Sequence, residues 1–222
     1  MNVLLRNGDS LTLDDGAKAM DAAKAISDSL ARNAVAVKIN DKLCDLSAAL
    51  SAGDKLEFVT LKDKEGLEVY RHTCAHVLAQ AVKTIFPTCK LAIGPVIENG
   101  FYYDIDFNTP ITQEDFGKIE AEMQKIIKAN TPIERFELPR KEAIELMTRY
   151  KEKYKVELIN DLPEDAVISF YKQGAFTDLC RGPHLPSTGR IKAFKLTSLA
   201  GAYWRGNEKN KMLTRIYGVA FA

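Results

Sequence analysis

The chain has 222 residues, a formal net charge of +1 and 46% hydrophobic residues, which is the composition of an ordinary globular protein. Charged residues make up 27%, and this balance excludes a disordered, collagen-like or low-complexity chain. No stretch is apolar for long enough to span a bilayer. The first residues lack the positively charged segment followed by an apolar segment that is typical of a signal peptide. We therefore expect a soluble, cytoplasmic protein with no membrane partner. The four cysteines form no CxxC pair and are expected to be free thiols.

The first 60 residues predict a small β-grasp, ubiquitin-like domain. Two short apolar runs flank Asn7-Gly8, a pair that favours a tight hairpin turn because both central positions need positive φ. An alanine-rich stretch over 19–31 carries apolar residues at helical spacing and predicts one helix. Further short strands are expected at 35–39, 43–46 and 56–60. Strands and helix in this order are typical of the β-grasp fold.

A charged run over 62–66 that ends in glycine predicts a boundary, which places the first domain at 1–62 and a second at 63–222. The second domain is expected to begin with a long helix over 67–86, ended by Pro87. A hairpin follows, in which 91–97 and 101–105 pair through Asn99-Gly100. Later helices are expected over 112–130 and 140–150, and strands at 155–159, 167–171, 176–180 and 194–198. This mixture of helices and antiparallel hairpins, without a βαβ rhythm, indicates the α+β class.

Every histidine of the chain lies in one of two short clusters. His72 and His76 are one turn apart in the long helix, opposite its apolar stripe, so two solvated surface histidines are the alternative to a site. His184 follows Cys180 across Gly182-Pro183, which prevents a continuing helix and makes the two neighbours across a turn. Two imidazoles on a helix, with a thiol and an imidazole on a loop, suit a tetrahedral zinc ion. They suit equally a metal-free site for acid–base chemistry on an ester.

The common phosphate-loop, dinucleotide, serine-hydrolase and zinc-protease motifs are absent. If the chain is an enzyme, water is therefore the expected nucleophile, with a histidine as proton acceptor and Lys155 as the group that stabilises negative charge. The alternative for Lys155 is an ordinary exposed lysine. Asp178 lies two residues before Cys180 on a predicted strand, so both are expected to face the same side.

The segment 181–215 holds eight basic residues and one acidic residue, interleaved with Phe194, Tyr203 and Trp204. The segments before it are mildly acidic. This composition is typical of a surface that faces a polyanion, and a solvated basic face with core aromatics is the alternative.

Four motifs, taken together, resemble the N-terminal region of the bacterial threonyl-tRNA synthetases: RHTCAH at 71–76, GPVIENGFYYD at 94–104, DLCRGPH at 178–184 and GAYWRG at 201–206. The resemblance covers the whole chain. It implies a TGS domain, which is a β-grasp unit, over 1–62 and an editing domain related to that of alanyl-tRNA synthetases over 63–222. It also implies that the ATP-dependent ligase core, with its ATP and zinc, is absent from these residues, and that a homodimer would form through parts absent here.

The resemblance implies hydrolysis of serine mis-esterified to the 3′ end of threonine tRNA. A pocket built for threonine rejects serine by only about 1–3 kcal/mol, so a second, hydrolytic sieve is needed. The implied catalytic set is His72, Lys155, His76, Cys180 and His184, with the first two nearest the water and the ester. The implied substrate-binding set is Tyr103, Asp178, Gly94 and Pro95. The residues implied to follow the tRNA acceptor backbone are Arg181, Arg190, Lys192, Lys195, Arg205, Lys211 and Arg215.

No cofactor is expected for editing. The related alanyl editing domains hold zinc with a similar His-x3-His and Cys-x3-His set, and a metal here would be held by His72, His76, Cys180 and His184. The sequence leaves two other functions open. One is a zinc-dependent hydrolase of alanyl type that acts in trans, and the other is a non-catalytic tRNA-binding appendage.

Overall fold

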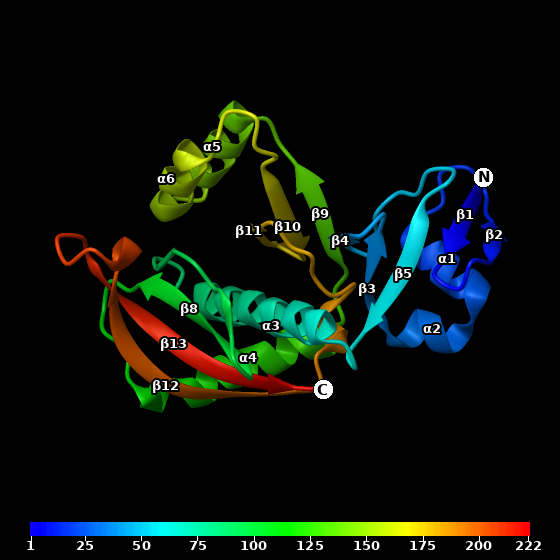
Figure 1. The fold of residues 1–222 in the computed structure, drawn as a ribbon. Coiled ribbons are helices and arrows are strands. Elements are labelled where there is room, and N and C mark those ends of the chain that lie inside the picture. The colour runs from blue at the N-terminus through cyan, green and yellow to red at the C-terminus, as the bar shows by residue number, and fades with distance from the viewer.

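In the computed structural model, which describes residues 1–222, the first 60 residues form a five-stranded sheet with two short helices (Figure 1). The strand order is β2-β1-β5-β3-β4, and the central pair β1 and β5 is parallel while the other pairs are antiparallel. The strands are β1 (Asn2–Leu5), β2 (Ser10–Thr12), β3 (Ala34–Ile39), β4 (Lys42–Cys44) and β5 (Lys55–Thr60). This topology confirms the β-grasp prediction for the amino-terminal unit, as we call residues 1–60.

The single helix predicted over 19–31 is wrong. The structure has α1 (Ala19–Ile26) and α2 (Asp28–Asn33), separated by Ser27 in extended backbone conformation. The Ser27 hydroxyl accepts a hydrogen bond from the Leu30 backbone N–H at 3.0 Å, so it caps the start of α2. Helical spacing of the apolar residues continues across this serine, and the local cap overrides that spacing.

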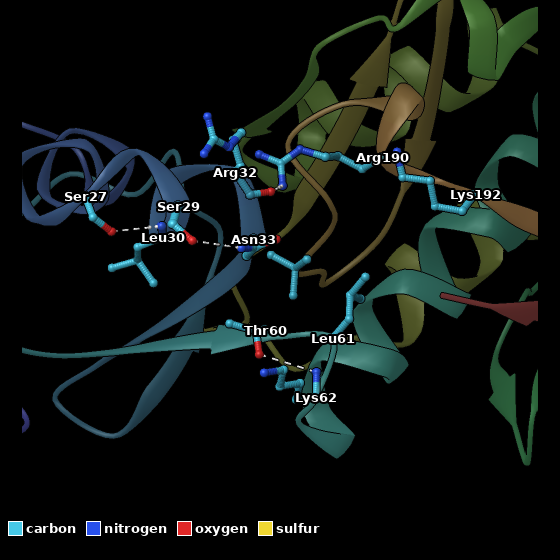
Figure 2. Close-up of a pocket in the computed structure, with 11 residues that line it drawn as sticks. Ser27, Ser29, Leu30, Arg32, Asn33, Thr60, Leu61, Lys62, Arg190 and Lys192 are labelled. Carbon is cyan, nitrogen blue, oxygen red and sulfur yellow. Dashed lines mark hydrogen bonds between the residues drawn. The ribbon is translucent and has the colours of Figure 1, made fainter.

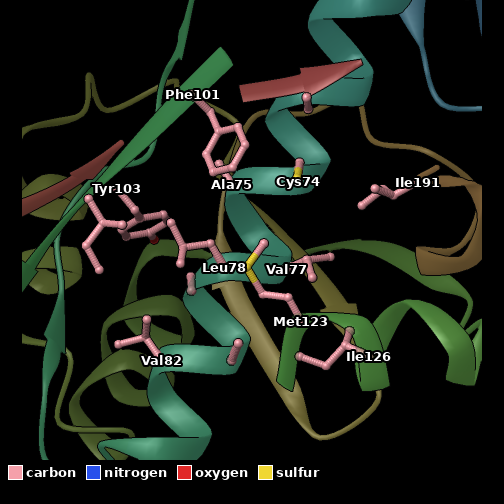
Figure 3. Close-up of a cluster of buried hydrophobic side chains, with 14 of the residues drawn as sticks. Cys74, Ala75, Val77, Leu78, Val82, Phe101, Tyr103, Met123, Ile126 and Ile191 are labelled. Carbon is pink, nitrogen blue, oxygen red and sulfur yellow. The ribbon is translucent and has the colours of Figure 1, made fainter. Parts of the chain in front are cut away.

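The larger unit, residues 64–222, is organised around the long helix α3 (Lys64–Ile85). With α4 (Phe116–Ala129), this helix covers one face of the antiparallel sheet β12-β13-β8-β6, to which the short strand β7 adds (Figure 1). Figure 3 shows α3 and α4 packed through Leu78 and Met123, with Phe101 of β8 beside the helix. The strands are β6 (Lys90–Leu91), β7 (Val96–Ile97), β8 (Gly100–Asp106), β12 (Ala193–Tyr203) and β13 (Met212–Phe221). None of the helices has the length and apolar character needed to cross a membrane.

A second, three-stranded antiparallel sheet lies on another side of α3, in the order β11-β10-β9 (Figure 1). Its strands are β9 (Ile133–Glu137), β10 (Ser169–Gln173) and β11 (Phe176–Leu179). The helices α5 (Arg140–Arg149) and α6 (Lys153–Asp161) pack on this sheet through a small core that includes Met147, Ile159 and Phe170. Three single 3-10 turns complete the unit: η1 (Gln113–Asp115), η2 (Thr188–Arg190) and η3 (Trp204–Gly206). The α+β class is confirmed.

Two strand predictions in the larger unit are wrong. Residues 155–159 lie in α6 rather than in a strand, because a short run of alternating polar and apolar residues fits both the helical and the strand period. The continuous strand predicted over 91–97 is split into β6 and β7 around Gly94-Pro95, and both pieces pair with β8. A Cβ on Gly94 would lie 2.3 Å from the Tyr103 ring, so the chain passes there only without a side chain. The strands β9 and β13 were not predicted.

The two units share a packed interface. Val35 and Val59 of the amino-terminal unit belong to the same buried cluster as Val69 of α3. Arg190 of η2 donates hydrogen bonds to the backbone carbonyls of residues 31, 32 and 34, where α2 ends. β5 ends at Thr60 and α3 begins at Lys64. The division into domains 1–62 and 63–222 stays a prediction.

Candidate active site

The four predicted donor side chains meet between α3 and the turn that follows β11. His72 and His76 come from α3, and Cys180 and His184 come from the turn. Their ligand atoms all lie within 4.8 Å of one another. The Cys180 Sγ is 3.4 Å from His72 Nε2 and 3.2 Å from His184 Nε2. Residues more than a hundred positions apart thus form one cluster, as their sequence pattern predicted.

The hydrogen bonds around Thr73 determine which His184 nitrogen carries the proton. The Thr73 hydroxyl donates to the Val69 carbonyl at 2.9 Å and accepts from the Leu185 N–H at 3.0 Å. Its Oγ1 also lies 3.0 Å from His184 Nδ1. Because a hydroxyl has a single proton, Nδ1 of His184 must be the donor in that contact. His184 Nε2 therefore presents a lone pair toward Cys180.

A buried charged network adjoins this cluster. Lys155 Nζ is 3.1 Å from Asp178 Oδ1 and donates to the Tyr103 hydroxyl at 2.9 Å. The Tyr103 hydroxyl donates to Asp178 Oδ2 at 2.6 Å, and His76 Nδ1 is 3.3 Å from the same oxygen. Lys155 is only 3% exposed, which excludes the alternative of an ordinary surface lysine. Since Lys155 lies on α6, the turn of a helix and not the alternation of a strand aims it at Asp178.

The other two predicted substrate-binding residues shape the wall beside this network. Gly94 lies against the Tyr103 ring, where no larger residue fits. The Pro95 carbonyl accepts a hydrogen bond from the Tyr102 backbone N–H at 3.2 Å, which holds the β7 strand end against β8. Direct contact of either residue with a substrate stays a prediction.

Comparison with known proteins matches both units. The TGS domain family model matches residues 1–60, and the model for the threonyl and alanyl tRNA synthetase second additional domain matches residues 168–217. The chain therefore carries both of these domains. Over its whole length it is 58% identical to the threonine–tRNA ligase of Clostridioides difficile and 57% identical to that of Clostridium tetani. It spans 35% of each relative, and the similarity is to their N-terminal part. The family resemblance inferred from the motifs is confirmed.

Burial sets the protonation of the donor cluster. It lowers the pKa of His72 to about 4 and lowers the pKa values of His76 and His184 well below their ordinary range. Burial also raises the pKa of the Cys180 thiol to about 12. At neutral pH the cluster therefore consists of neutral imidazoles and a protonated thiol. His76 and His184 are buried and His72 is half-buried, so the alternative of a solvated surface pair is wrong.

These lowered pKa values predict that the protein loses stability as the pH falls. Between about pH 7.5 and about pH 5.5 the unfolded histidines gain protons while the folded ones remain neutral, so protonation favours unfolding. We expect the free energy of unfolding to fall by on the order of 1 kcal/mol per histidine over this interval. Urea unfolding in the presence of a chelator measures it. A His72→Gln variant should show a smaller pH dependence, and equal stability at both pH values would contradict the buried neutral state.

The donor cluster also fits a metal ion. Three imidazole nitrogens and one sulfur are a set that zinc accepts. Two of the imidazoles have the outer hydrogen-bond partners that orient a histidine ligand, Thr73 for His184 and Asp178 for His76.

Most of the basic residues predicted to face RNA have partners within the fold. Ion pairs join Lys195 to Glu120, Arg205 to Glu157 and Asp161, Lys211 to Asp106, and Arg215 to Asp104. Arg190 is engaged with backbone carbonyls, which leaves Arg181 and Lys192 without an ion pair. Acids from earlier segments thus neutralise much of the positive excess of 181–215. Contact of these residues with tRNA stays a prediction.

Sequence reasoning missed two contributors to the turn that carries Cys180 and His184. Asp45 of the amino-terminal unit accepts a hydrogen bond from the His184 backbone N–H, and Tyr171 of β10 packs on the His184 ring. Asp45 lies 139 residues from His184 along the chain, so no local spacing could have indicated the contact.

Proposed function

We propose that this chain hydrolyses the ester that joins serine to the 3′ end of mischarged threonine tRNA. The observation that supports it most directly is the juxtaposition of a neutral, half-buried histidine with the buried Lys155–Asp178–Tyr103 network. The similarity to threonine–tRNA ligases supplies the substrate class. Water is the nucleophile in this proposal.

His72 acts as the proton acceptor. It is the most accessible of the three histidines, and its neutral ring can take a proton from water as the oxygen attacks the ester carbonyl. The carbon–oxygen bond to the ribose then breaks, and the proton passes to the leaving ribose oxygen. The products are free serine and tRNA with its terminal hydroxyl restored.

Lys155 stabilises the negative charge that develops on the carbonyl oxygen. Two of its three ammonium protons are directed at Asp178 and Tyr103, which leaves one for a substrate. Burial, with the nearby Asp178 carboxylate, raises the pKa of Tyr103 well above its ordinary value, so its hydroxyl remains a donor. Asp178 and Tyr103 therefore hold the ammonium in one place before the reaction begins.

We propose that hydrolysis proceeds without metal, because a His72 lone pair bound to a metal would not be free to accept a proton. If zinc were bound by His72, His76, Cys180 and His184, it would supply a Lewis acid for the carbonyl or the water. The two mechanisms are distinguished by a chelator, which would leave the metal-free reaction unchanged and would inhibit the zinc-dependent one.

The test of the proposed function is release of amino acid from tRNA by the 222-residue chain. Seryl-tRNA is the substrate, and threonyl-tRNA and alanyl-tRNA are the controls. We expect serine to be released at least about tenfold faster than threonine, with no effect of EDTA. Absence of serine release above background would favour the non-catalytic appendage. Preferential, chelator-sensitive release of alanine would favour the alanyl-type hydrolase.

For the tRNA partner, we propose that phosphates bind a groove between the two units. Its lining includes Arg32, Lys62, Arg190 and Lys192 and contains no acidic residue (Figure 2). Ser27 and Ser29 also line the groove. A groove with several cations and no carboxylate favours a polyanion over other ligands.

Replacing Lys62 and Lys192 together with alanine is expected to weaken tRNA binding by removing phosphate contacts. The slope of log K against log salt should decrease by about 1 per lysine lost. Fluorescence anisotropy over a salt series measures this slope. Lys128→Ala, at the exposed end of α4, is the matched control and should keep the parent slope. An unchanged slope in the double variant would place the phosphates elsewhere.

A further inference from the structure

The amino-terminal unit contributes one carboxylate to the turn that carries Cys180 and His184. Asp45 follows β4 directly. Its Oδ1 accepts a hydrogen bond from the His184 backbone N–H at 2.8 Å, and its Oδ2 accepts one from the Tyr171 hydroxyl at 2.6 Å. Both oxygens of a residue in the TGS domain are thus committed to the larger unit.

Tyr171 connects this carboxylate to the His184 imidazole. The Tyr171 ring meets the His184 ring edge-on, with centroids 4.3 Å apart and an interplanar angle of 72°. Its hydroxyl lies directly over Gly182, where an added Cβ would be 1.8 Å from the phenolic oxygen. Gly182 also has a φ of +70°, which few other residues adopt. The turn can approach Tyr171 this closely only because residue 182 is glycine. Asp45 holds the Tyr171 hydroxyl above that glycine.

His184 is consequently fixed at two points. Thr73 binds its ring through Nδ1, and Asp45 binds its backbone N–H. The Cys180 sulfur depends on the same turn, because it accepts the Gly182 N–H at 3.2 Å and lies 3.2 Å from His184 Nε2. Loss of Asp45 would release the backbone end of His184 and the hydroxyl that packs on Gly182. The distance from the turn to His72 would then no longer be held.

We propose that Asp45 is a positioning residue of the hydrolytic site, so that the TGS domain completes a site whose reacting groups all lie in the larger unit. The proposal rests on the proposed function. Asp45 touches no reacting atom. It acts by holding the 180–184 turn and the Tyr171 hydroxyl in place.

The kinetic test compares Asp45→Ala, Asp45→Asn and Tyr171→Phe with the parent chain. Asp45→Ala should lower kcat for seryl-tRNA hydrolysis about tenfold with KM nearly unchanged, because a small displacement of catalytic groups lowers the rate more than binding. Asp45→Asn should restore most of kcat. Its amide oxygen can accept the His184 N–H, and its NH2 can donate to the Tyr171 oxygen. Asp14→Ala, an exposed residue of the same domain without an ion pair, is the matched control.

A parental kcat in Asp45→Ala, or no recovery in Asp45→Asn, would overturn the proposal. If Asp45→Ala does not fold by circular dichroism, Tyr171→Phe decides, since it removes only the hydroxyl and should lower kcat in the same direction. Parental kcat in that variant would likewise overturn the proposal.

A readout that does not depend on activity separates this proposal from the proposed function. Nitrogen-15 NMR of the histidine rings should show His184 protonated at Nδ1 in the parent chain and in Asp45→Asn. In Asp45→Ala we expect the His184 ring resonances to shift or broaden. If the parent chain releases no serine, the proposed function fails, and the NMR comparison still tests whether Asp45 positions His184. Identical ring resonances in all three proteins would overturn the positioning role.

Discussion

Replacing His72 with alanine is expected to lower the rate of seryl-tRNA hydrolysis by about 10²–10⁴-fold, the range that a positioned general base contributes. His72 is the half-buried histidine of the cluster, and burial lowers its pKa to about 4, so at neutral pH its ring is neutral and has a lone pair free to accept a proton from water. Binding of tRNA should remain, because the proposed phosphate contacts lie in the groove between the units and not at His72. Single-turnover deacylation and a separate binding titration measure the two effects.

The control for His72→Ala is Thr84→Ala, an exposed residue three turns further along the same helix. This variant should keep the parent rate, which shows that a change in α3 is not harmful in itself. If the His72→Ala protein kept the parent rate, His72 would not be the proton acceptor. His76 or a bound metal would then be the remaining candidates for activating the water.

The parts of the site that the sequence predicted are those encoded by short local patterns. The His72–His76 spacing places both rings on one helix, and Gly182-Pro183 forces the turn that brings His184 next to Cys180. The strands of the β-grasp unit could likewise be predicted from the sequence, because each strand has its own apolar run and turn residues. In each case a physical rule acts over a few residues.

The parts that the sequence did not predict depend on distant partners. In the sequence, nothing distinguishes Asp45 from the other acidic residues near β4. Only folding brings it next to His184. The composition of segment 181–215 predicts a strongly basic surface. In the structure, however, Asp104 and Asp106 form ion pairs with Arg215 and Lys211 and neutralise their charge. Lys155 falls within a predicted strand because residues 155–158 alternate between polar and apolar, a pattern too short to distinguish a strand from a helix.

Asp178→Ala is expected to cause the largest loss of stability of any change at this site. Asp178 is 2% exposed and accepts contacts from Lys155, Tyr103 and His76. Its removal leaves a buried ammonium without a counter-charge and a phenol without an acceptor, so the free energy of unfolding should fall by about 3–5 kcal/mol. Urea unfolding measures the change. The same argument applies to Lys155→Ala, which would leave the buried Asp178 carboxylate without its counter-charge, so this variant is expected to lose stability as well as activity.

A second substitution separates the lost ion pair from the lost volume. Adding Lys155→Met to Asp178→Ala removes the unpaired charge, so part of the stability should return although two polar residues are now missing. The matched control is Glu68→Ala, which breaks the exposed Lys64–Glu68 pair at 4.0 Å and should cost less than about 1 kcal/mol. A double variant less stable than Asp178→Ala would mean that the cost lies in packing. The network would then owe its rigidity to the filled volume around Tyr103 rather than to paired charge.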